Sequence, residues 1–237
     1  MHAVHAFVFA HFTADQRYLL GTTWNLVLCV IPIWLARRAE RFDERAPSPP
    51  GRAHQVALAL LLIAWLAFVP NTCYLLTEWR HLYFLLVDAG WPQKVWHQPR
   101  YYADMAYWTF FFQAYSAAGL LAMTLAIRPI ARLCARHGIK FLYLEPALFV
   151  MMSIAVYLGL VVRLNSWNVV THPEVVAVHV LRIPTHPVLS LTVVLFAGYL
   201  LGVYHMMEVL VEGVVGRWKA RCGRESDRSP SPGAAGP

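Results

Sequence analysis

Long apolar runs alternate with short polar segments along this chain. Runs of about 20 continuous apolar residues predict helices that cross a bilayer, whereas a strictly alternating pattern would predict strands. Such helices are expected over residues 18–35, 53–69, 102–127, 141–162 and 187–211. Because the lipid interior offers no water to backbone polar groups, these runs favour a helix bundle. The sequence therefore predicts an all-α polytopic membrane bundle with about five transmembrane helices, in one domain over residues 18–212.

The second apolar run has an unusual end. It stops at Pro70-Asn71 and restarts as an amphipathic segment over residues 72–87. Its i, i+4 and i+3 spacing puts Tyr74, Glu78 and His81 on one helical face. The segment is too charged at its centre to span comfortably. We therefore expect an interfacial or re-entrant helix after the second span.

Composition supports a membrane protein. The 237 residues are 58% hydrophobic and only 14% charged, whereas soluble domains carry about 25% charged residues. The net charge of +7 is explained by basic loops on one membrane face, so the bilayer is the expected partner and nucleic acid is not. The four cysteines are far apart and form no CxxC pair, so no zinc or redox motif is present and no cofactor is expected.

The basic residues give an orientation. Residues 36–52 hold five Lys/Arg, residues 128–140 four and the tail five, which leaves six elsewhere. The positive-inside rule then predicts an inner-membrane protein with its N-terminus outside and its C-terminus in the cytoplasm. Residues 1–17 become an outer leader, and residues 213–237 are expected to be a disordered, basic cytoplasmic tail.

This topology brings two polar segments to the outer face. One follows the break in the second span, the other follows the fourth span, and an acidic residue of the third span lies at a similar depth. We expect them to bind or transport a small polar or anionic ligand, with Arg163 paired to a carboxylate such as Glu78 or Asp104. The candidate residues are Asn71, Tyr74, Thr77, Glu78, His81, Asp104, Arg163, Asn165, Ser166, Trp167 and Asn168.

Two other interpretations remain open. In a structural one, Pro70-Asn71 caps a helix, Arg163 extends to the membrane surface and Glu78 pairs with a nearby arginine. In the other, Glu78-x-x-His81 is a pair of metal ligands in a metal-dependent membrane enzyme, completed by His97 or His172. One Glu-x-x-His occurs often by chance, so no metal site is assigned. On the inner side, Glu145, His205 and Glu208 are expected to be solvated or, alternatively, to relay protons.

Both outer segments resemble a bacterial multi-pass membrane family, the domain of unknown function number thirteen sixty-one. The resemblance implies the fold and topology over about residues 18–211, and it implies no activity. Glu78 and Asn168 stand where this family has aspartate, and the second change removes a carboxylate that a metal would need. The matching residues are Trp24-Asn25-Leu26, Ile31-Pro32, Pro70, Asn71, Tyr74, Leu75, Thr77, Glu78, His81, Leu82, Arg163, Asn165, Ser166, Trp167 and Asn168.

Overall fold

A computed structural model describes residues 14–47, 49–79, 82–83, 87, 94, 98–164 and 168–226. Within these ranges every regular element is a helix, which confirms the all-α prediction. The elements are α2 (Ala14–Glu44), α3 (Arg52–Phe68), α4 (Asn71–Thr77), α7 (Pro99–Arg136), the short 3₁₀ turn η1 (Phe141–Tyr143), α8 (Glu145–Tyr157), the π-helical η2 (Leu158–Val162), α9 (Asn168–Thr171), α10 (Pro173–Arg182) and α11 (Pro187–Ser226).

Four helical stretches in the described part are long and apolar enough to cross a membrane. They are Arg52–Thr77, Pro99–Arg136, Glu145–Val162 and Pro187–Arg221, and they indicate a membrane protein. Three of them contain an expected span, and Glu145–Val162 covers most of the expected span 141–162. The remaining expected span, residues 18–35, lies within α2, whose side chains are described from residue 21 onward. The total of five spans stays a prediction.

Three helices continue beyond their expected ends into basic segments. α2 reaches Glu44, α7 reaches Arg136 and α11 reaches Ser226. Arginine and lysine are good helix formers, so charge alone does not end a helix. Pro47 follows α2, and Gly138 after α7 has the positive φ of 71° that favours glycine. The expected disorder is therefore wrong for residues 213–226, which are helical, and residues 227–237 lie outside the described ranges.

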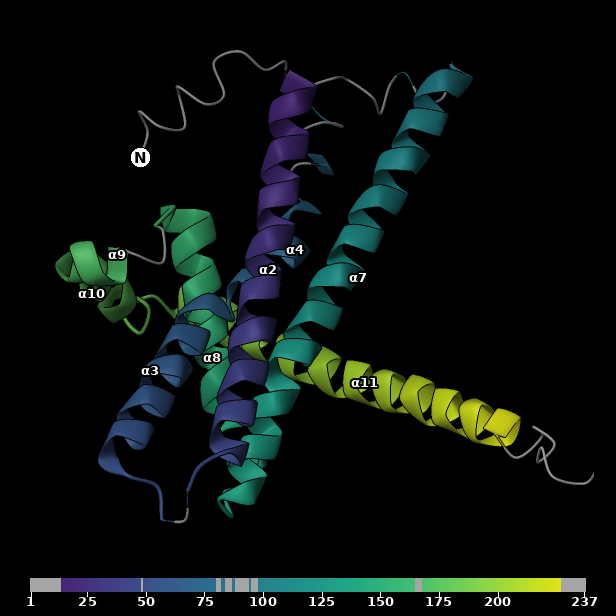
Figure 1. The fold of residues 1–237 in the computed structure, drawn as a ribbon. Helices are drawn as coiled ribbons and strands as arrows, with labels where there is room; N and C mark the ends of the chain where they lie inside the picture. Colours follow the sequence, from purple (N-terminus) through teal and green to yellow (C-terminus); the bar gives the residue numbers. More distant parts are fainter. Residues whose placement is uncertain are drawn as a thin grey trace, which may run out of the picture.

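The bundle is held together mainly through α2, α7 and α8. α2 packs against α3 and α7, α4 packs against α2, α7 and α8, and α11 packs against α8 and α7. Figure 1 shows α11 crossing the lower part of the bundle at a steep angle and projecting to one side. The largest fully buried side chains of the core include Met123, Ile127, Phe149, Met152 and Tyr204.

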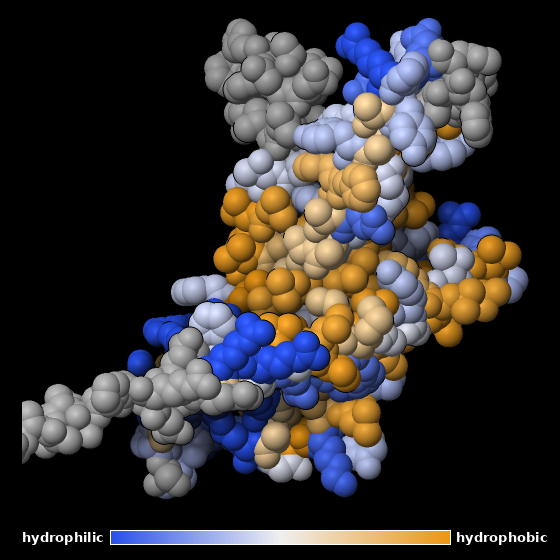
Figure 2. Space-filling model, turned by 90° about the vertical axis from the view of Figure 1, so that its right-hand side faces the viewer, coloured by the Kyte–Doolittle hydropathy of each residue, from blue (hydrophilic) through white to orange (hydrophobic). Residues whose placement is uncertain are grey.

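Apolar side chains also cover much of the outside. Trp34, Leu60, Phe110 and Leu195 are each at least 60% exposed, as expected for residues that face lipid chains. Figure 2 shows hydrophobic residues over the middle of one face and hydrophilic residues toward both ends, with the larger group at the lower end. The lower end of Figure 1 holds the turn between α2 and α3 and the C-terminal end of α7. Two of the basic segments therefore lie at the same end of the bundle.

The segment after the fourth span contains two short helices. Residues 163–186 belong to none of the expected spans, but they include α9 and α10. α10 has Pro173 at its first position, Glu174 in its first turn and Arg182 in its last turn. Proline fits the start of a helix. A negative charge in the first turn and a positive charge in the last turn both interact favourably with the helix dipole. Those local signals account for a helix that the hydropathy pattern alone did not indicate.

Candidate functional site

The helix is interrupted between α3 and α4, and this interruption positions the first polar segment. Pro70 has no N–H to donate, so the α-helical ladder cannot continue through it. The nearby donors are satisfied locally: the Thr72 N–H donates to Val69 O at 3.2 Å and the Cys73 N–H to Pro70 O at 3.0 Å. The Thr72 hydroxyl also donates to Val69 O, at 2.8 Å, which gives a third hydrogen bond at the break. The helix break predicted from Pro70-Asn71 is thus stabilised by the residues beside it.

After this break, α4 enters the bundle interior. Asn71 is 7% exposed, while Thr72, Cys73 and Leu75 are fully buried. A Cβ atom on Gly119 of α7 would lie 2.7 Å from Leu75 Cβ and 2.8 Å from Thr72 O. The close approach of α4 and α7 therefore requires glycine at position 119, since backbone oxygen cannot move aside as a flexible side chain can.

Polar side chains of α4 and the turn after it bind other helices. The Tyr74 hydroxyl donates to Ala155 O of α8 at 3.0 Å, and Trp79 Nε1 donates to Ser116 Oγ of α7 at 2.8 Å. Glu78 Oε1 accepts a longer bond, 3.4 Å, from Asn25 Nδ2 of α2. Thr77 Oγ1 donates to Tyr74 O within the segment at 2.8 Å. This segment therefore joins α2, α7 and α8 through hydrogen bonds.

Tyr74 also contacts the turn that leads to the second polar segment. A Cβ atom on Gly159 of η2 would lie 2.6 Å from Tyr74 Cζ and 2.8 Å from Cε1, so only glycine leaves room for this ring. η2 ends at Val162, and the next residue, Arg163, has a left-handed backbone with φ 62° and ψ 35°. The Arg163 N–H donates to Leu158 O, and the Leu164 N–H reaches the same oxygen at 3.0 Å.

The Arg163 side chain is exposed. It forms no ion pair with an acidic residue in the described ranges, so the expected pairing with Glu78 or Asp104 is wrong there. Asp104 is half-buried near the start of α7 and makes no hydrogen bond or ion pair to any residue whose placement is described. The structure thus connects Tyr74 to the turn before Arg163, and it connects Glu78 to α2 instead.

The other candidates are placed as follows. Asn168 is half-buried at the start of α9, and His172 is exposed just before α10, with Nδ1 3.6 Å from Glu174 Oε1. Among the described residues, no three His, Cys, Asp or Glu side chains form a group that could hold a metal ion. The metal hypothesis is not tested by this, because two of its ligands are not described. His81, His97, Asn165, Ser166 and Trp167 lie outside the described residues.

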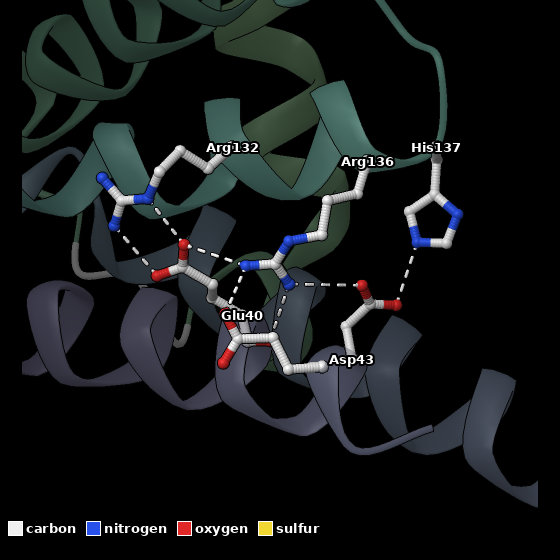
Figure 3. A network of polar contacts seen from close by, with 6 residues as sticks. Glu40, Asp43, Arg132, Arg136 and His137 are labelled. Carbon is white, nitrogen blue, oxygen red and sulfur yellow. Dashed lines mark hydrogen bonds and ion pairs between the residues drawn. The ribbon is translucent and has the colours of Figure 1, made fainter. Parts of the chain in front are cut away.

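At the opposite end, sequence reasoning missed a network of ion pairs between α2 and α7 (Figure 3). Arg132 binds Glu40 through two nitrogens, with Nε 2.6 Å from Oε1 and Nη2 2.9 Å from Oε2. Arg136 reaches Glu40 at 3.3 Å and also pairs with Glu44. These arginines were treated as loop charges. The helical spacing of Glu40 and Glu44, matched by Arg132 and Arg136, is a signal that could have found the network.

A second cluster near the basic end of the bundle joins α8 and α11. Glu145 is only 6% exposed, so the expected solvated position is wrong for this residue. His205 Nε2 lies 3.0 Å from Glu145 Oε2, and His205 Nδ1 lies 3.9 Å from Glu208 Oε2. The first contact lacks hydrogen-bond alignment, which leaves Oε2 without a hydrogen-bond partner among the described residues. These groups therefore meet where α11 packs against α8.

Comparison with known families matches residues 24–206 to the family described as "Protein of unknown function (DUF1361)". The match covers more than half of the chain and includes both polar segments, the break after α3 and the turn at Arg163. No curated protein and no solved structure matches the chain.

Proposed function

The chain belongs to the DUF1361 family of proteins of unknown function, and we propose from its own geometry that it binds or transports a small anionic ligand through Arg163. The supporting observation is the Arg163 turn: an exposed guanidinium on a left-handed backbone, directly after a π-helical segment. Strained residues and π-helical turns are both frequent at functional sites.

The backbone conformation of Arg163 indicates that this residue does more than end the helical segment η2. A left-handed residue commonly ends a helix, but that residue is usually glycine. Any other residue there costs roughly 1–2 kcal/mol. A guanidinium can hold a carboxylate or phosphate group with two parallel hydrogen bonds. Binding of an anion accounts for the use of arginine where glycine would give a more stable turn.

The contacts of Tyr74 support this assignment. Its hydroxyl binds Ala155 O, and its ring fills the space beside Gly159. Both contacts lie one to two turns before Arg163, so α4 holds the turn that presents the guanidinium. In this proposal the polar residues of α4 position Arg163, and the ligand contacts Arg163 together with the segment that follows it.

We propose that this site lies on the outer face of an inner membrane. α8 begins shortly after the basic segment at the end of α7 and runs upward from it in Figure 1, so η2 and Arg163, which follow α8 in the chain, lie away from the basic end. The positive-inside rule assigns the basic end to the cytoplasm. The N-terminus is then outside and the C-terminus cytoplasmic.

The test measures the thermal unfolding midpoint, Tm, of detergent-purified protein with inorganic phosphate, glycerol 3-phosphate or succinate. At least one of these anions is expected to raise the Tm of the wild type. Arg163→Gln removes the guanidinium and is expected to abolish the rise. Arg163→Gly also abolishes it, while the Tm without anion stays equal or increases because glycine relieves the left-handed strain.

Arg100→Gln is the matched control, since Arg100 is an exposed arginine at the start of α7. It should leave the anion response unchanged. A response that persists in Arg163→Gly, or a wild type that responds to none of the three anions, would contradict the proposal. A large loss of stability in Arg163→Gly would instead favour a structural role for the side chain.

A further inference from the structure

We propose that an apolar groove between α3 and α8, at the basic end of the bundle, binds one acyl chain of an anionic phospholipid. The groove encloses a volume of about 290 Å³, at the lower end of the range for small-molecule pockets. Its lining includes Trp65 and Leu66 of α3, Ile130 and Cys134 of α7, Phe141 of η1 and Ala147 of α8. This site is distant from Arg163 and independent of the proposed function.

The lining accepts hydrocarbon and little else. The most polar atom of its side chains, Trp65 Nε1, donates to Ala126 O at 3.0 Å, so it is not available to a ligand. A polar molecule would lose its hydrogen bonds to water on entering such a groove. An empty groove would leave its walls without dispersion contacts on one side. An acyl chain from the surrounding bilayer restores these contacts without desolvating a polar group.

The position of the groove sets the depth of the head group. Phe141, which lines it, is flanked by Lys140 and followed by Leu142 and Tyr143. Leu142 and Tyr143 are 63% and 74% exposed. Exposed tyrosine beside exposed leucine is typical of the membrane–water interface. Lys140 is therefore at the level of the lipid head groups, directly beside the groove.

The charge at this end favours an anionic lipid over a neutral one. Lys140 is exposed and forms no ion pair with any described residue. The same holds, within the described ranges, for the exposed side chains of Arg37, Arg38, Arg41, Arg45 and Arg52. By contrast, Arg132 and Arg136 are neutralised by acidic residues of α2. A cluster of unneutralised cations at the cytoplasmic surface attracts anionic head groups.

The experiment is native mass spectrometry of the full chain, purified in detergent and mixed with equal amounts of phosphatidylglycerol and phosphatidylcholine. We expect one tightly held lipid, with phosphatidylglycerol preferred. Ala147→Phe fills the groove and should reduce that binding at least tenfold. Val150→Phe is the matched control, because Val150 is an exposed residue of α8 that does not line the groove. It should leave binding unchanged.

A second pair of variants tests the head group. Lys140→Gln should still hold one lipid but lose much of the preference for phosphatidylglycerol, whereas Arg100→Gln should keep it. Glycerol 3-phosphate should not compete, because it has no acyl chain. Equal binding by Ala147→Phe and Val150→Phe would overturn the proposal, since it would show an unspecific lipid shell. So would equal binding of the two lipids, or a wild-type dimer that Ala147→Phe converts to a monomer.

Discussion

At the scale of single residues, the contact of Tyr74 with Gly159 explains why two distant segments belong together. The tyrosine hydroxyl binds Ala155 O across 81 positions in sequence, and the glycine leaves room for the ring. The helix break before Tyr74 could be predicted, because the missing N–H of Pro70 is a local property. The partner of Tyr74 could not, since it depends on how α4 and α8 pack and glycine carries no pattern of its own.

This contact predicts a steric effect at Gly159. Gly159→Ala would place a methyl group 2.6 Å from Tyr74 Cζ, too close for the ring to keep its position. We expect the free energy of unfolding to fall by about 1–3 kcal/mol, as for other overpacked sites. Thermal or denaturant unfolding in detergent measures the effect.

Gly198→Ala serves as the control. It lies in α11 with open space around the added methyl group, so stability should stay the same or rise by up to about 1 kcal/mol. Tyr74→Phe should restore part of the loss in Gly159→Ala. Equal effects of the two alanine substitutions would mean that Tyr74 does not limit the space at Gly159.

At the scale of elements, the ends of α2 and α7 differ most from their predicted positions. Hydropathy locates the lipid-facing middle of a helix well, but it treats arginine as a loop residue. Here Arg132 and Arg136 lie on helical turns that face Glu40 and Glu44. The ion pairs stabilise the helical ends and align α2 with α7. The pairing depends on which helices are neighbours, and an apolar pattern does not reveal this.

Glu40 should be the most important acidic residue of this network. Its side chain is 11% exposed and binds both arginines, whereas the Glu44 side chain is 50% exposed. Glu40→Gln is expected to lower the free energy of unfolding by about 1.5–3 kcal/mol, since it weakens several charged hydrogen bonds. Glu44→Gln should cost only about 0–1 kcal/mol, as exposed ion pairs do.

Unfolding of both variants at low and high salt distinguishes the two sites. Salt should reduce the effect of Glu44→Gln more than that of Glu40→Gln, because exposed pairs are screened more strongly. If both substitutions destabilise the protein equally, the bidentate contact of Glu40 is not the main connection between α2 and α7.

At the scale of the whole molecule, the sequence predicts the all-α class and the location of four of the expected spans, although three of the helical stretches continue beyond the expected ends. These features follow from hydrophobic periodicity, which needs no knowledge of partners. The burial of α4, the helical content of residues 213–226 and the angle of α11 do not follow from it. They depend on packing between helices, which in a membrane is governed by small residues such as Gly119 rather than by hydropathy.

The orientation of the chain is a further prediction at this scale. Ala46→Cys and Glu174→Cys would be placed separately into a chain in which Cys222 is serine, since Cys29, Cys73 and Cys134 are buried. A membrane-impermeant maleimide should label Glu174→Cys in intact cells. It should label Ala46→Cys only after the membrane is opened, because that position adjoins the basic end, which the positive-inside rule assigns to the cytoplasm. The reverse pattern of labelling would show the opposite orientation.

The function proposed for Arg163 depends on the number of residues in the π-helical turn Leu158–Val162 as well as on their identity. Successive residues of an α-helix are separated by about 100° around the axis. One residue more or fewer in this turn would rotate everything that follows by that angle relative to Tyr74. Arg163 would then point in another direction even though every side chain was kept. In descendants of this chain, insertions and deletions here should be rarer than substitutions.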